Sequence, residues 1–172
     1  WTGPFVMAMA NTLVVRRGAV LLAENNNGYG ENFVYKESAY YSKRRSAYIT
    51  TFMLYLMGFV IVTPLRKLVR PLLKKPGQGP SQSVMDGGYF KCKFVVTGES
   101  GHQKIYSMSG SGDPGYKVTS KLVCEGALSL LGDHNNLPGG ANYGGILTAS
   151  SGLGGVLVDR LEKAGITFEE SS

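Results

Sequence analysis

The chain has 172 residues, a hydrophobic fraction of 43% and 24 glycines. This composition excludes an intrinsically disordered protein and favours a folded chain with many turns. The formal net charge is +6, but the positive charge is concentrated in one segment, which argues against a nucleic-acid-binding face. The first residue is Trp1. Because translation does not begin at tryptophan, we expect further residues to precede it.

Residues 1–42 are expected to form the first part of an α/β domain. Apolar positions recur at helical spacing from Pro4 to Ala23, and Pro4 suits a first helical turn. The asparagine-rich run at 25–28 then breaks this spacing. From Phe33 to Tyr41 the residues alternate well enough to predict a short strand.

The segment Lys43–Lys75 combines an apolar run with most of the excess positive charge. It contains eight of the 18 basic residues and no acid, so the rest of the chain is slightly negative. The uncharged residues between Arg45 and Arg66 would form a helix of about 30 Å, which is enough to cross a bilayer core. Pro64 is expected to kink or end that helix.

Beyond Pro64, leucine and valine recur at helical spacing among basic residues, which predicts a second, interfacial helix. Cations flank both ends of the apolar run, so the positive-inside rule gives no orientation and a helix in one leaflet is favoured. A spanning helix and a helix buried against a protein partner stay open. The predicted membrane contacts are Tyr48, Phe52, Leu54, Tyr55, Leu56, Phe59, Ile61, Leu65, Leu68, Leu72, Arg66, Lys67 and Arg70.

Residues 76–87 are predicted to be a linker rich in proline and glycine, and residues 88–172 the remainder of the α/β domain. Tyr89 to Val96 alternates with a period of two, which predicts a half-buried strand. His102 to Ser109 is its expected hairpin partner across a glycine turn.

Two helices and a strand are expected in the rest of the chain. Thr119 is a suitable cap for a leucine-rich helix, and a glycine-rich loop leads to a last helix at Val156–Lys163. Gly165 should end that helix, before a terminal strand at Ile166–Glu169. The expected fold class is α/β or α+β: a small mixed sheet covered by helices, with the apolar and basic helix projecting outward. Its strands are expected near Phe33, Phe90, Tyr106 and Phe168.

Side chains that could carry chemistry are few. His102 and His134 occur in polar, turn-like contexts and are interpreted as surface residues without a catalytic role. Cys92 and Cys124 are expected to be buried, reduced thiols, and we predict no metal site. Asp113 could contact a substrate, but aspartate before proline more commonly accepts hydrogen bonds from turn amides, which is the favoured interpretation.

Blocks of sequence in a fixed order resemble the carboxy-terminal region of saccharopine dehydrogenase-like oxidoreductases, and the resemblance covers nearly the whole chain. The blocks are Gly3–Met7 with Asn11-Thr12 and Val15–Arg17, Tyr29-Gly30 with Phe33–Tyr35, Lys75–Ser81, Gly112–Tyr116, Leu137–Gly140, and Asp159–Leu161 with Gly165–Phe168.

The resemblance implies a Rossmann domain that binds NAD(P) and that is absent from this chain. The chain has no G-x-G-x-x-G between a strand and a helix. The glycine-rich run Ser151–Gly155 precedes a helix, but it is interpreted as a helix start rather than a phosphate cradle, and no cofactor-binding residue is named. The resemblance supplies no catalytic residue either.

The leading functional interpretation is the carboxy-terminal domain of a membrane-associated, saccharopine dehydrogenase-like oxidoreductase that is not catalytic on its own. The alternative is a non-enzymatic subunit or membrane anchor within a larger membrane complex. The expected partners are membrane lipid and either a second copy or a larger membrane complex, without nucleic acid. The resemblance implies a location at the mitochondrion or the lipid droplet, and the residues do not choose between them.

Overall fold

The chain folds as two units, Trp1–Gly79 and Pro80–Ser172. The structure, a computed structural model, describes residues 1–73, 77–140 and 142–171. Lys74 and Lys75 of the predicted basic segment lie outside the described residues, as do the side chains of Leu72 and Ser171. The predicted division of the chain at residues 42, 75 and 87 stays a prediction.

The first unit opens with strand β1 (Thr2–Gly3), helix α1 (Ala8–Glu24) and strand β2 (Ala39–Tyr40). The predicted helix is confirmed, although it begins at Ala8 rather than at Pro4. Asn26 ends it in a left-handed conformation with φ of 57°, which asparagine tolerates better than most residues. The predicted strand from Phe33 to Tyr41 is mostly wrong, because only Ala39–Tyr40 pairs, antiparallel to β1.

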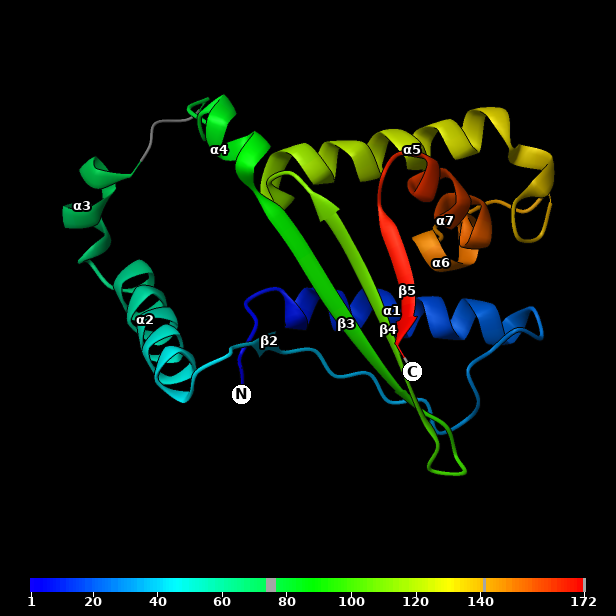
Figure 1. Ribbon diagram of the computed structural model, residues 1–172, viewed down its shortest axis with the longest axis horizontal. Helices are drawn as coiled ribbons and strands as arrows, with labels where there is room; N and C mark the ends of the chain where they lie inside the picture. Colours follow the sequence, from blue (N-terminus) through cyan, green and yellow to red (C-terminus); the bar gives the residue numbers. More distant parts are fainter. Residues whose placement is uncertain (74–76, 141, 172) are drawn as a thin grey trace. The chain divides into compact units, whose positions relative to one another are not determined.

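The apolar and basic segment forms helix α2 (Arg44–Val62), the short helix α3 (Arg66–Val69) and the 3₁₀ turn η1 (Arg70–Leu72), which follow one another in Figure 1. The break at Pro64 is therefore confirmed. The predicted second helix is present but short, because regular α-helix runs only from Arg66 to Val69. Pro71 explains the stop, because it lacks the amide proton that would continue the α-helical hydrogen bonds, and the chain goes on as the 3₁₀ turn η1.

The second unit contains helix α4 (Gln82–Gly87) and strands β3 (Tyr89–Thr97), β4 (Gln103–Ser111) and β5 (Thr167–Ser171). Helix α4 occupies part of the predicted linker. The strands form an antiparallel sheet in the order β3-β4-β5, with β4 in the middle (Figure 1). The predicted hairpin is confirmed, but the mixed sheet is wrong, and the region near Phe33 does not belong to this sheet.

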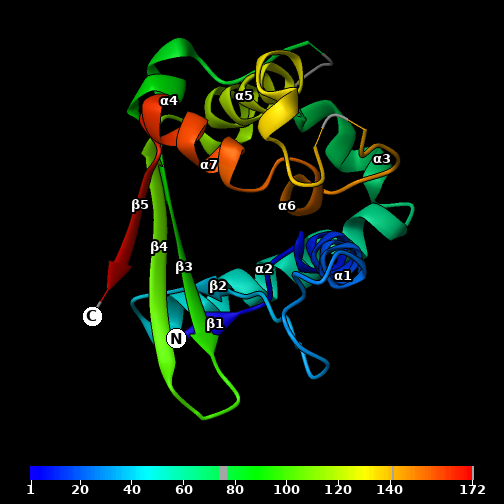
Figure 2. The ribbon, with the colours of Figure 1, turned by 90° about the vertical axis from the view of Figure 1, so that its right-hand side faces the viewer.

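The remaining elements are the π-helical turn η2 (Pro114–Val118), helix α5 (Thr119–Gly132), the 3₁₀ turn η3 (His134–Asn136), helix α6 (Ala149–Gly152) and helix α7 (Gly154–Lys163). Helices α5 and α7 lie at the end of the hairpin away from its turn (Figures 1 and 2). Val118, Leu161 and Ile166 form the buried core there. Partly buried apolar side chains pack around these three: Phe90, Met108, Leu122, Leu157 and Phe168.

Two local expectations in this unit are corrected. Thr119 does not cap α5, because the helix continues directly from η2, and the Thr119 hydroxyl donates a hydrogen bond to the Pro114 carbonyl at 2.6 Å. Asp113 is the residue before the helical run, and its carboxylate accepts from the Tyr116 amide. Cys92 and Cys124 are exposed rather than buried. Cys92 shares a face of β3 with Phe90, but the core reaches Phe90 and leaves the rest of that strand exposed.

Candidate functional site

The predicted membrane contacts lie on α2, on α3 and in the residues next to α3, and most of them are exposed. Tyr48, Phe52, Tyr55, Leu56, Phe59, Ile61, Leu65 and Leu68 are exposed, as are the cations Arg66, Lys67 and Arg70, whereas Leu54 is half-buried. The side chain of Leu72 lies outside the described part. Among the described residues, α2 is the helix long and apolar enough to cross a membrane, with a mean hydropathy of 1.5, and 6% of its apolar window is buried.

Helix α2 has two different sides. Successive residues are about 100° apart around a helix, so Phe52, Leu56 and Phe59 project from one side while Ala47 projects from the opposite one. Ala47 is buried, and its neighbour Thr51 packs near β1, where a Cβ added to Gly3 would lie 3.1 Å from the Thr51 hydroxyl oxygen. The unit therefore covers the Ala47 side in the first half of α2, whereas in the second half Met57 and Ile61, which project toward that side, are exposed like Phe52, Leu56 and Phe59.

A cluster of aromatic rings and a guanidinium lies at the first turn of α2. The Arg44 guanidinium is 5.4 Å from the centroid of the Trp1 ring and 5.4 Å from that of Tyr48. Arg44 also donates a hydrogen bond to the Tyr48 hydroxyl at 3.3 Å. Cation–π contacts of this kind keep a charged group beside exposed rings, so the start of α2 carries both apolar surface and positive charge.

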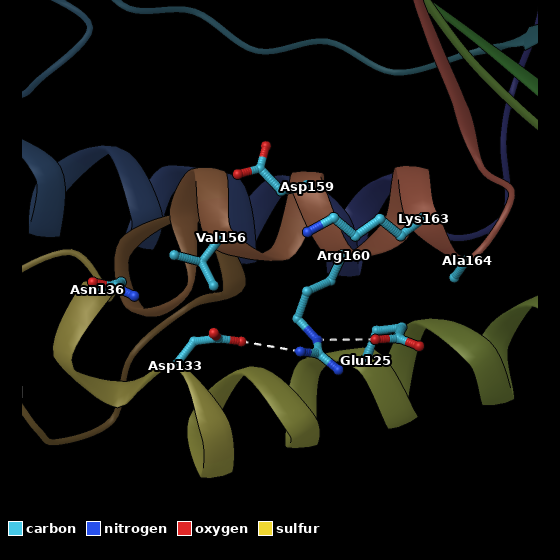
Figure 3. A pocket seen from close by; sticks show the side chains of 8 residues that line it. All are labelled: Glu125, Asp133, Asn136, Val156, Asp159, Arg160, Lys163 and Ala164. Carbon is cyan, nitrogen blue, oxygen red and sulfur yellow. Dashed lines mark hydrogen bonds and ion pairs between the residues drawn. The ribbon is translucent and has the colours of Figure 1, made fainter.

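The second unit contains a cavity of about 480 Å³ between α5, η3 and α7 (Figure 3). Arg160 extends from α7 toward α5. Its Nε donates to Glu125 at 2.9 Å and its Nη1 to Asp133 at 3.0 Å. The side chains of Arg160, Glu125 and Asp133 are 28%, 21% and 32% exposed.

Three charged residues of this cavity are paired with one another, so their charge is not directed at a ligand. We call the contacts of Arg160 with Glu125 and Asp133 the Arg160 brace. Both carboxylates direct an oxygen at the same guanidinium, so the positive charge of Arg160 is already balanced within the chain. In Figure 3, Asp159 points away from this pair of contacts. The network holds α7 against the middle of α5, at Glu125, and against its carboxyl end, at Asp133, and nothing in its geometry favours a substrate or a metal ion.

The other residues considered for chemistry are separated along the second unit. His102 lies in the turn between β3 and β4, His134 lies in η3, and both are exposed. The interpretation of Asp113 is confirmed, because its carboxylate accepts a hydrogen bond from the Tyr116 amide at 2.7 Å. Among the described residues, no group of three or more His, Cys, Asp or Glu is placed to hold a metal ion.

The glycine-rich run at Ser151–Gly155 forms a packed corner between α6 and α7. Thr148 and Ser151 form a capping box that satisfies the first amides of α6. A Cβ at Gly154 would lie 2.6 Å from Pro138, and one at Gly152 would lie 3.2 Å from Leu147. Side chains of the chain itself therefore pack against Gly152 and Gly154, whereas nothing lies within 4 Å of a Cβ built at Gly155.

Two exposed ion pairs connect elements of the second unit. Lys117 lies 2.6 Å from Asp86, and its hydrogen bond, together with one from Gln82, lowers the pKa of the Asp86 carboxyl. Lys104 lies 2.8 Å from Glu170, whose hydrogen bond and charge raise the pKa of Lys104. Surface pairs of this kind contribute little to stability.

The sequence reasoning did not anticipate the Arg160 brace. An indication was present, because Arg160 occurs between Leu157 and Leu161 on the apolar side of a predicted helix. A long cation at such a position needs a partner. Which acids supply it depends on the pairing of α5 with α7, and helical periodicity alone does not give that pairing.

Comparison with known proteins finds relatives along nearly the whole chain. A Mycobacterium tuberculosis H37Rv protein, provisionally named a trans-acting enoyl reductase, is 33% identical over 178 aligned residues, covering 98% of this chain and 41% of the relative. A trans-acting enoyl reductase of Mycobacterium bovis BCG is 31% identical over 179, covering 98% and 40%. One of Mycobacterium ulcerans is 30% identical over 175, covering 96% and 40%. No protein-family model and no solved structure matches the chain significantly.

These relatives correct the functional expectations. Proteins 30–33% identical along nearly all of the chain are named trans-acting enoyl reductases, so the identification as a saccharopine dehydrogenase-like region is wrong. The function inferred from that resemblance, a domain of a membrane-associated saccharopine dehydrogenase-like oxidoreductase, is therefore also wrong. The alternative of a non-enzymatic subunit or membrane anchor is wrong as well. Mitochondrion and lipid droplet likewise have no support from these relatives. The chain spans about two fifths of their length.

Proposed function

We propose that this chain is part of a trans-acting enoyl reductase. The observation that carries the proposal is the similarity to proteins of that name over 96–98% of the chain. Similarity spread over every element supports a shared domain better than a match at one motif would, because it includes the core, the turns and the helix ends together.

Enoyl reduction saturates a carbon–carbon double bond beside a carbonyl group. A hydride is added to the β-carbon and a proton to the α-carbon, while the hydride donor is oxidised. We propose a reduced nicotinamide dinucleotide as the donor, held outside these 172 residues. The filled corner at Gly152 and Gly154 supports this placement, because Leu147 and Pro138 occupy the space near the backbone. No residue of this chain is assigned to the transfer.

In this proposal the chain supplies a supporting domain to the reductase. The second unit has the rigidity that such a role requires, because Val118, Leu161 and Ile166 join α5, α7 and the sheet, and Arg160 binds two acids across the helices. Domains of this kind position a substrate or a partner without making or breaking bonds themselves.

A hybrid protein tests the proposal on this chain. The corresponding 40% of the Mycobacterium bovis relative is replaced by these 172 residues, and the hybrid is assayed on an enoyl thioester that the unmodified relative reduces. We expect reduction of the double bond, measured as consumption of the reduced dinucleotide and as a product two hydrogens heavier.

The matched control is a hybrid with Leu161→Asp, which places a charge in the buried core and should abolish activity by unfolding the inserted domain. A hybrid that melts cooperatively, binds the dinucleotide and yet does not reduce the thioester would contradict the proposal.

A further inference from the structure

The strongest unassigned feature of the molecule is the outward side of α2. Ile49, Phe52, Met53, Leu56 and Phe59 are all exposed there, and they lie within about 120° of one another around the helix. Large apolar patches on the surface of a protein mark sites of association with protein or membrane. The charges around this patch decide between these two partners.

The charge around α2 is of one sign only. From Ser38 to Met85 the sequence contains no acidic residue. Arg44 and Arg45 lie in the first turn, and Arg66, Lys67 and Arg70 follow the last one, all exposed. A protein partner would need to match cations at both ends of a helix of about 28 Å. An anionic lipid surface supplies negative charge along its whole extent.

The aromatic cluster at the start of α2 suits the boundary between lipid and water. Trp1 and Tyr48 have exposed rings, and the Arg44 guanidinium lies 5.4 Å from the centroid of each. Tryptophan and tyrosine favour the headgroup level of a membrane, because one end of each side chain is apolar and the other is polar. Arginine beside them keeps its charge in water while its stem covers apolar surface.

We infer that α2 binds an anionic phospholipid membrane, lying within one leaflet with Phe52, Leu56 and Phe59 in the acyl region. The opposite side of the helix supports the in-plane orientation. Ala47 is buried and Thr51 packs near β1, so protein already covers that side at its first half. Cations at both ends of α2 then reach headgroups of the same leaflet.

Vesicle flotation tests the inference with the full-length protein. We expect the protein to float with vesicles of phosphatidylglycerol and phosphatidylcholine, and weakly with phosphatidylcholine alone. Phe52→Asp, Leu56→Asp and Phe59→Asp together should abolish flotation, since charged groups enter hydrocarbon at high cost. The matched control places three aspartates at the exposed α5 residues Val123, Leu130 and Leu131 and should float normally.

A second variant tests the electrostatic part separately and leaves the apolar residues unchanged. Arg66→Gln, Lys67→Gln and Arg70→Gln together should reduce binding to anionic vesicles on the order of 100-fold at low salt, at about 5-fold per cation. The loss should shrink as salt rises. These cations are exposed, so the variant is expected to fold normally.

Three outcomes would overturn the inference. One is flotation of the three-aspartate α2 variant at the level of the parent. Another is a parent protein that does not float and forms a dimer, together with a three-aspartate variant that is monomeric. That result would assign the patch to contact with a second copy of the chain. The third is resistance to alkaline carbonate with protease access from both sides, which would show a spanning helix. Flotation measures lipid binding alone, so its result is independent of enoyl reduction.

Discussion

Replacing Arg160 tests the packing of the second unit. Arg160→Met keeps much of the side-chain volume and removes the charge, which leaves the carboxylates of Glu125 and Asp133 without their guanidinium. These acids are 21% and 32% exposed, so the loss should lie between that of a surface pair, roughly 0–1 kcal/mol, and that of a broken buried pair, roughly 3–5 kcal/mol. We expect a loss of about 2 kcal/mol.

Amide hydrogen exchange measures this loss of stability directly in helices α5 and α7. A destabilisation of about 2 kcal/mol should speed exchange of the α5 and α7 amides on the order of 30-fold where exchange requires opening of the unit. Arg160→Lys should recover part of the protection, because a lysine reaches one carboxylate without the fork of the guanidinium.

The control is Lys104→Gln, which breaks an ion pair whose side chains are 64% and 49% exposed and should leave the exchange of these helices unchanged. Equal exchange in the Arg160→Met and Lys104→Gln variants would refute the bracing role.

Two further predictions concern the same unit. Gly154→Ala should lower the melting temperature, because Gly154 has φ of 51° and the new Cβ would lie 2.6 Å from Pro138. The control Gly155→Ala should leave the melting temperature unchanged, because nothing lies within 4 Å of its new Cβ. Equal melting temperatures of the two variants would contradict this prediction. The Asp86–Lys117 pair lowers the pKa of Asp86, so its contribution is present at neutral pH and is lost as pH falls through that lowered pKa. Lys117→Gln should therefore return the pKa of Asp86 toward its ordinary value in an NMR titration, and an unchanged titration would refute the pairing.

Local patterns predicted the elements whose cause is local. The hairpin of β3 and β4 follows from the alternation at Tyr89–Val96 and the glycine turn after it, and the register runs without interruption from Tyr89↔Ser111 to Thr97↔Gln103. The break at Pro64 and the stop at Gly165, where φ is 85°, follow from the backbone preferences of single residues.

Expectations that depend on distant partners were less successful. The alternation from Phe33 to Tyr41 is typical of a strand. A strand extends only as far as its partner pairs with it, however, and β1 pairs only at Thr2–Gly3. Local patterns could not give the strand order of the sheet either, because helices α5, α6 and α7 lie between β4 and β5 in the chain.

The mistaken family resemblance has a physical explanation. Several matched blocks carry structural roles: Asp113 binds the Tyr116 amide, Leu161 belongs to the core, and Gly165 takes a left-handed backbone. Residues with such roles report a turn or a packing contact and not a reaction. The membrane-contact residues were chosen for a different reason, apolar composition beside positive charge, and they remain a proposal that rests on the exposed side of α2.

Turnover by the full-length protein tests enoyl reduction most directly. The protein is mixed with a reduced nicotinamide dinucleotide labelled with deuterium at the transferable position and with a 2-enoyl thioester, both free and attached to an acyl carrier protein. We expect a saturated thioester that carries deuterium at the β-carbon, with loss of the reduced dinucleotide in equal amount. Recovery of the unsaturated thioester in both forms, from protein that is folded and binds the dinucleotide, would contradict it.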